Sequence, residues 1–177
     1  MKEQRLNLEI HAELGKRFVP HLRTHLTRAY ATLRTGPNEL SIALVGDKRM
    51  SKLHEKYMGI AGPTDVLTFE LEHDNRGRVA SGEVVVCVPQ AKRQALPRLP
   101  QLLPLPVRWE RGQKSDSLQD ELLLLCLHGL LHLCGYNDLM PRDAAAMHRA
   151  EDRILTRLGI GKVYARGQAV QAIRGHG

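Results

Sequence analysis

The most apolar stretch of this chain reads Leu122-Leu123-Leu124-Leu125-Cys126-Leu127-His128-Gly129-Leu130-Leu131-His132-Leu133-Cys134-Gly135-Tyr136-Asn137-Asp138. A segment that is apolar on every side of a helix is typical of a helix buried inside a domain. The preceding Ser117-Leu118-Gln119-Asp120 resembles a capping box, which marks a helix start. Gly135 is the residue type that commonly ends a helix. The stretch therefore predicts a long central helix around which the other elements pack.

Two histidines stand four residues apart in this helix, so both side chains project from the same face. The chain reversal at Gly135 can return Asp138 to them as a third ligand. Three protein ligands with one open position are typical of catalytic zinc. In the alternative interpretation, His128 and His132 are core histidines bonded to backbone carbonyls. The spacing favours a metal, because burying three such groups without a partner is costly.

The same spacing occurs in metzincin proteases, which carry a third histidine where this chain has Asp138. Those proteases also place a glutamate directly after the first histidine, as the general base. Here that position is Gly129, so proteolysis is disfavoured. A metal-dependent hydrolase of another substrate, such as a peptide, is the weakest hypothesis for this site.

Along the rest of the chain, strand patterns come first and helix patterns cluster after them, which predicts an α+β fold. We expect one small mixed β-sheet, the central buried metal-binding helix, and further packed helices. Strands are expected at residues 6–10, 40–45, 66–71 and 83–88, and helices at about 12–33, from an Asp47 N-cap to Gly59, from Pro89, and from Pro141 to Leu158.

The length of 177 residues predicts a single domain, which we place at residues 1–160. Residues 97–117 hold several prolines and a charged run, and they are interpreted as a long loop or flap. Residues 161–177 are interpreted as a basic, flexible tail. We expect a monomer.

The chain carries a net charge of +7, which suits a polyanion such as RNA but also an ordinary solvated surface. Three cysteines without a C-x-x-C pair do not form a disulfide framework and favour a reducing compartment. The charged N-terminus predicts no signal peptide, and the apolar run is too short to span a bilayer. We therefore expect a cytoplasmic protein without membrane association.

The histidine stretch, with its Gly135-Tyr136 end, resembles the signature of the YbeY family of bacterial metal-dependent endoribonucleases in rRNA maturation. Pro63-Thr64-Asp65-Val66-Leu67-Thr68-Phe69 is similar to that family's Pro-Thr-Asp-Val-Leu-Ser-Phe, and Gly82-Glu83-Val84 to its Gly-Asp-Ile. Downstream, Asp143, Met147 and Glu151 stand where the family has an acidic residue, a methionine and a glutamate. The likeness is collinear from about Leu40 to Leu158.

This resemblance implies an α+β domain with one zinc ion per chain in a cleft. It implies cleavage of single-stranded RNA in small-subunit rRNA processing and ribosome quality control. RNA and the ribosome or its proteins are then the expected partners. The alternative is a non-catalytic RNA- or ribosome-associated maturation factor that keeps the metal site.

The chain departs from the family at the third ligand and at an arginine. Asp138 replaces the family's third histidine, and Asn137 replaces the aspartate before it. Aspartate still binds zinc but widens the choice toward manganese, iron or nickel, and Asn137 or water is an alternative third contact. Met58 replaces an arginine that the family is taken to use on RNA phosphate, and Lys56 is a possible substitute, although it lacks the guanidinium fork.

The predicted mechanism has His128, His132 and Asp138 holding the metal, which acidifies water and polarises a phosphate oxygen. Glu83 is a candidate general base or a hydrogen-bond acceptor behind the ligands, with a solvated strand-end carboxylate as its alternative. Thr64 and Asp65 are candidates for lining the cleft. A turn with a side-chain hydrogen bond explains them equally well.

Overall fold

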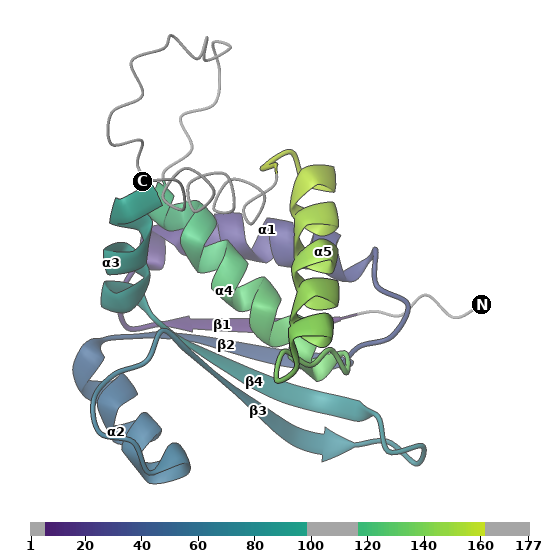
Figure 1. Ribbon diagram of the computed structural model, residues 1–177, viewed down its shortest axis with the longest axis horizontal. Helices are drawn as coiled ribbons and strands as arrows, with labels where there is room; N and C mark the ends of the chain where they lie inside the picture. The colour runs from purple at the N-terminus through teal and green to yellow at the C-terminus, as the bar shows by residue number, and fades with distance from the viewer. Residues whose placement is uncertain (1–5, 99–116, 162–177) are drawn as a thin grey trace, which may run out of the picture.

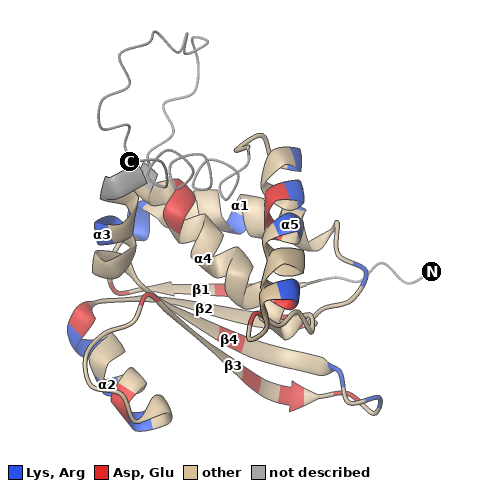
Figure 2. Cartoon of the chain, viewed as in Figure 1, with Lys and Arg blue, Asp and Glu red and all other residues tan. Residues whose placement is uncertain are grey.

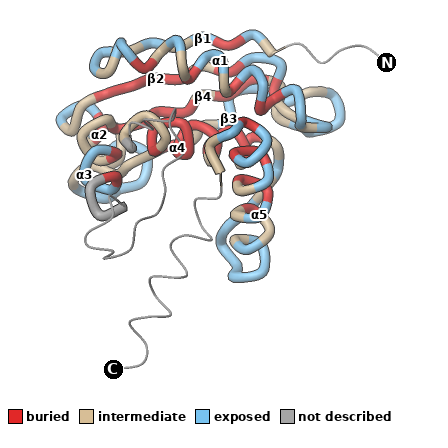
Figure 3. Tube along the Cα trace, turned by 90° about the horizontal axis from the view of Figure 1, so that it is seen from above, coloured by how far each residue is buried: buried red, intermediate tan, exposed pale blue. Residues whose placement is uncertain are grey.

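Helix α4 (Ser117–Leu133) lies at the centre of the fold, as its apolar sequence predicts. The computed structural model describes residues 6–98 and 117–161. In chain order the other elements are β1 (Asn7–Ala12), a 3-10 turn η1 (Lys16–Phe18), α1 (Val19–Tyr30), β2 (Glu39–Val45), α2 (Asp47–Met58), β3 (Val66–His73), β4 (Val79–Cys87), α3 (Val88–Arg98) and α5 (Pro141–Arg157). Figure 3 shows α4 as a largely buried segment, with its leucines in the core.

The four strands form one mixed sheet in the order β1-β2-β4-β3. The pairs β1–β2 and β2–β4 are parallel, whereas β3 and β4 form an antiparallel hairpin. Parallel neighbours need a crossover connection, which α1 provides between β1 and β2. Helices α1, α3, α4 and α5 lie on one face of the sheet and α2 lies on the other (Figure 1). This arrangement confirms the predicted α+β class with a mixed sheet.

Alternation along β4 divides the core between the two faces of the sheet. Val84 and Val86 are fully buried in the large cluster that contains the leucines of α4. Val85 and Cys87 point the other way, into a smaller cluster with Met50 of α2. Successive strand residues point to opposite faces, so the odd and even positions of β4 serve different sides of the molecule.

Two glycines allow α4 to lie directly on the sheet. A Cβ added at Gly129 would lie 2.6 Å from both methyl groups of Val84 and 2.9 Å from Oγ1 of Thr68. A Cβ at Gly82 of β4 would lie 2.6 Å from the methyl groups of Leu133. The absence of side chains at these positions fixes the height of the helix over the sheet, and hence the position of its histidines.

Several predicted boundaries are wrong, and each has a local cause. The first strand runs to Ala12. The helix expected from that residue begins only after Gly15, whose left-handed φ of 71° is incompatible with a regular right-handed helix. Gly46 rather than Asp47 is the N-cap of α2, and the Asp47 carboxylate accepts a hydrogen bond from Arg93 at 2.6 Å. The fourth strand starts earlier than residue 83, because the hairpin extends its pairing back to Val79.

The end points of other elements confirm the sequence patterns. Helix α2 ends at Gly59 in the left-handed conformation, and α5 begins at Pro141. The interior of the predicted loop 97–117 (residues 99–116) and the tail after residue 161 lie outside the described residues. Within residues 6–98 and 117–161, no helix is both long and apolar enough to cross a membrane.

Candidate metal centre

The last two turns of α4 place the imidazoles of His128 and His132 against each other. Their Nε2 atoms are 3.1 Å apart, and the rings meet edge to face with centroids 4.6 Å apart. Both side chains are partly buried, at 19% and 28% exposed. This is the geometry expected of residues one helical turn apart on a shared face.

A Schellman motif at the end of α4 turns the chain back toward the histidines. The N–H of Tyr136 donates to the Leu131 carbonyl and that of Gly135 to the His132 carbonyl, with Gly135 at φ 91°. The side-chain oxygen of Asn137 then accepts a hydrogen bond from the Leu139 N–H at 2.9 Å. Asn137 therefore fixes the turn, which argues against its use as the third ligand.

Asp138 is the residue that this turn returns to the histidines. Its Oδ2 lies 3.6 Å from Nε2 of His128 and 3.7 Å from Nε2 of His132. One ligand atom from each of the three residues lies within 4.8 Å of the others. The structure thus assembles the predicted set from two helix positions and one loop position, and the set fits a metal site.

The remaining ring nitrogens are held by acceptors. Nδ1 of His128 lies 2.8 Å from Oε1 of Glu151, and Nδ1 of His132 lies 3.1 Å from the Tyr136 carbonyl oxygen. A carbonyl oxygen can only accept a hydrogen bond, so we assign the proton of His132 to Nδ1, which donates to the Tyr136 carbonyl. A carboxylate also only accepts, so a neutral His128 likewise carries its proton on Nδ1, facing Glu151. Both Nε2 lone pairs then converge on Asp138. A divalent cation is the partner that suits three converging electron-rich atoms.

Glu151 of α5 is fully buried, and its Oε2 has no hydrogen-bond partner within the described part of the chain. Burial alone lowers the pKa of His128, but the hydrogen bond and charge of Glu151, with the charges of Asp138 and Asp65, outweigh it and raise the pKa. The cluster therefore carries excess negative charge, which a cation compensates.

Glu151 is the functional residue for which sequence reasoning assigned no role. A signal for it was present, since Glu151 follows Met147 by one helical turn and precedes Ile154 by nearly one. These neighbours form the buried stripe of α5, where a carboxylate is unexpected unless it has a partner. Only the packing of α5 on α4 shows that this partner is His128.

The structure places Thr64 and Asp65 directly before β3, outside the ligand set. Oδ1 of Asp65 accepts from the Val66 N–H at 2.8 Å and from the Thr64 hydroxyl at 3.2 Å, while Oδ2 accepts from the Gln94 amide at 2.9 Å. These bonds match the turn interpretation and tie the loop to α3. The Asp65 charge still acts on His128.

Glu83 is not brought to the histidines. It pairs across the sheet with Ser41 and Phe69, and it shares the face of Val85, which packs toward α2. The metal ligands stand on the opposite face, with α4. The proposed role of Glu83 as general base is therefore corrected: the sheet itself separates the carboxylate from the site.

Lys56 and Met58 also belong to the α2 side. Lys56 is exposed, with Nζ 5.0 Å from the centre of the Tyr57 ring, and Tyr57 packs edge-on against Phe69 of that face. Met58 is 50% exposed at the last residue of α2. Neither residue belongs to the group of three converging ligands.

Gly129 explains why a protease-type base is absent. A Cβ at this position would lie 2.6 Å from the Val84 methyl groups and 2.9 Å from Oγ1 of Thr68, so a glutamate there has no room unless the helix moves off the sheet. Tyr136 packs against the main core.

Comparison with known proteins agrees with this geometry. The family model described as endoribonuclease YbeY matches residues 2–101 and 106–159. Proteins named endoribonuclease YbeY from Thermobifida fusca and Moorella thermoacetica are 38% and 34% identical, over 66% and 71% of this chain and 70% and 76% of theirs. The relative from Frankia alni is 35% identical over 66% of this chain, and the match spans 61% of that relative.

A solved structure supports the fold independently. The solution structure of a Thermotoga maritima protein superposes with a TM-score of 0.53, covering 85% of this chain and 91% of that one, at 20% identity. At this identity the likeness concerns the fold alone. Taken with the family match over nearly the whole described chain, the chain belongs to the endoribonuclease YbeY family.

Proposed function

We propose that this chain is a metal-dependent endoribonuclease that cleaves single-stranded RNA in small-subunit rRNA maturation and ribosome quality control. The observation that carries the proposal is the convergence of His128, His132 and Asp138 in a chain of an endoribonuclease family. The relatives are named endoribonucleases, and the net charge of +7 suits an RNA substrate. The proposal includes rRNA and ribosomal partners and a cytoplasmic location.

The proposed cofactor is one zinc ion per chain, with another divalent transition metal as the alternative. Two imidazole nitrogens and one carboxylate oxygen are a ligand set that zinc accepts, and three protein ligands leave a position open. When bound, such a metal supplies Lewis acidity toward water and a phosphate oxygen.

The residues of the chain prepare this chemistry. Glu151 and the Tyr136 carbonyl hold the two rings by Nδ1, which leaves Nε2 of each free to bind. Asp138 is 39% exposed, so the third ligand opens the site to solvent and to a substrate. A second carboxylate, Glu151, balances the charge from behind, away from the substrate side.

The test uses the full chain with zinc or manganese, a labelled single-stranded RNA and the same RNA in a duplex. We expect cleavage of the single strand, with loss of both cleavage and bound metal in His128→Ala and His132→Ala. His11→Ala is the matched control, because His11 is an exposed histidine on β1. Wild-type protein that holds metal and RNA but cleaves neither substrate would overturn the enzyme proposal.

That last outcome would select the non-catalytic maturation factor instead. Met58, in place of the family's arginine, is the observation that favours this second function. A Met58→Arg variant separates the two, because an enzyme limited by the missing cation gains activity, whereas a binding factor does not.

A further inference from the structure

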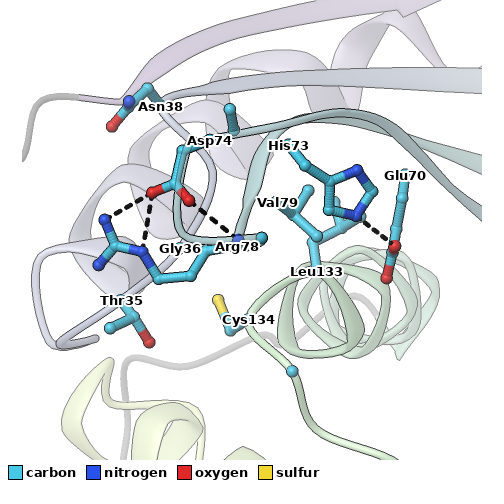
Figure 4. A pocket seen from close by; sticks show the side chains of 13 residues that line it. Thr35, Gly36, Asn38, Glu70, His73, Asp74, Arg78, Val79, Leu133 and Cys134 are labelled. Carbon is cyan, nitrogen blue, oxygen red and sulfur yellow. Dashed lines mark hydrogen bonds and ion pairs between the residues drawn. The ribbon is translucent and has the colours of Figure 1, made fainter.

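A cavity of about 300 Å³ lies at the C-terminal end of α4, between the loop after α1 and the β3–β4 hairpin (Figure 4). Leu133, Cys134 and Gly135 form the wall contributed by the helix. Thr35, Gly36 and Asn38 close one side, and Glu70 and His73 close the other. The volume is at the lower end of the range for small-molecule sites.

The cavity adjoins the metal centre along α4, and β3 packs against the same helix. Its helical wall begins at the residue directly after His132. On β3, Thr68 faces Gly129 of α4. Glu70 lies two residues further along β3, on the same face of the sheet, and it pairs with Gly82 of β4. Gly82 in turn faces Leu133 of α4. Glu70 therefore stands at the level of the helical turn that carries His132.

The polar groups of the lining differ in how far they are already bonded. Asp74 accepts hydrogen bonds from the Arg78 guanidinium at 2.6 and 2.8 Å and from the Arg76 and Arg78 N–H groups, and Arg78 lowers the pKa of Asp74 to about 2. Arg78 and Asp74 thus neutralise each other. Among residues 6–98 and 117–161, by contrast, the Glu70 carboxylate bonds only to His73, through Oε2 at 2.9 Å, and keeps acceptor capacity on Oε1.

These features select a neutral, flat ligand that donates hydrogen bonds. Carboxylates repel phosphate, so the lining is unsuited to the RNA backbone itself. Leu133 and Val79 supply apolar surface, and the free oxygen of Glu70 accepts an N–H. Unpaired RNA bases are recognised in this way, by apolar contact together with hydrogen bonds to their polar edges.

We propose that this cavity receives an unpaired nucleobase of the substrate strand, next to the phosphodiester bond that is cleaved. The inference rests on the proposed function for its substrate. Glu70 accepts the exocyclic amino group of adenine, cytosine or guanine. Uracil has no amino group, and its N3–H lies between two carbonyl oxygens that the carboxylate repels, so the cavity disfavours uracil. A hydrogen bond to a charged group sets this preference at about tenfold.

The first experiment measures binding without cleavage. Cytidine and uridine are titrated into metal-free protein while amide resonances are followed by NMR. Cytidine is expected to shift Gly135 and Val79 and to bind more tightly than uridine. Glu70→Ala abolishes the difference, whereas Glu72→Ala, an exposed carboxylate on the same strand, retains it. Equal binding of both nucleosides, or shifts elsewhere on the protein, would overturn the proposal.

The second experiment measures selectivity with single-stranded RNAs that differ only by cytosine or uracil beside the cut. About a tenfold difference in kcat/KM is expected for wild type and Glu72→Ala, and none for Glu70→Ala or Glu70→Gln. Equal rates in the wild type would refute the base site while leaving the nuclease proposal intact. If no RNA is cleaved, the proposed function fails, and the nucleoside titration still decides on the cavity.

Discussion

Replacing Glu151 by glutamine tests whether a buried carboxylate prepares the metal site. The substitution preserves side-chain size in the buried stripe of α5 and removes the charge facing Nδ1 of His128, 2.8 Å away. Hydrogen bonds to charged groups contribute about 1.5–3 kcal/mol and neutral ones about 0.5–1.5 kcal/mol. The difference of roughly 1–1.5 kcal/mol predicts about tenfold weaker metal binding, at the lower end of the loss expected when such a supporting partner is changed.

The assay is competition for zinc against a chromophoric chelator at fixed pH, with thermal unfolding to confirm that the variant is folded. Asp143→Asn is the control, because Asp143 is an exposed carboxylate in the first turn of the same helix. NMR of the His128 ring should show the Nδ1–H tautomer weakened only in Glu151→Gln. A zinc affinity within about twofold of wild type in a folded Glu151→Gln protein would refute this reasoning.

Three further predictions concern packing and titration. Gly129→Ala should destabilise the protein by about 1–3 kcal/mol in denaturant unfolding, because the new methyl group would lie 2.6 Å from the Val84 methyl groups. Adding Val84→Ala should recover part of the lost stability. An unchanged unfolding midpoint in Gly129→Ala would contradict the close approach of helix and sheet. Because the pKa of His128 is raised in the fold, its protonation stabilises the metal-free protein fully below the ordinary pKa of 6.5, and this contribution is lost as pH rises through the raised pKa. The free energy of unfolding should therefore fall over this pH range in the wild type and not in His128→Gln. Parallel curves for the two proteins would refute the pairing of His128 with Glu151. Burial raises the pKa of Cys126 to about 12, so a thiol reagent near pH 8.5 should modify this fully buried cysteine only after unfolding. Rapid reaction of Cys126 in the native protein would contradict its burial.

The charge distribution shows why composition predicts a partner class but not a binding face. Lysines and arginines are spread over several helices, while glutamates occur on the strands, and α4 carries acidic residues only near its start (Figure 2). A net charge of +7 is a sum over the chain and holds no information on position. Lys56 illustrates this limit, since its place on α2 puts it across the sheet from the ligands.

Local order explains the part of the site that could be predicted. His128 and His132 share a face because helical geometry alone sets the separation of residues four apart, and Gly135 ends the helix through its own backbone freedom. The return of Asp138 needs only the few residues of the turn. These features depend on short stretches of chain, so their residue types and spacing were sufficient to predict them.

The roles of Glu151, Glu83 and Gly129 depended on contacts between distant segments. Glu151 reaches His128 because α5 packs on α4, and Glu83 is excluded because the register of β4 points it to the far face. In the sequence, Gly129 stands where a protease would have its catalytic base. In the fold, it is the position at which α4 packs closely on the sheet. The sequence by itself determined which residues could bind a metal; the tertiary structure decided which groups support them, because that depends on how helices and strands pack and not on spacing along the chain.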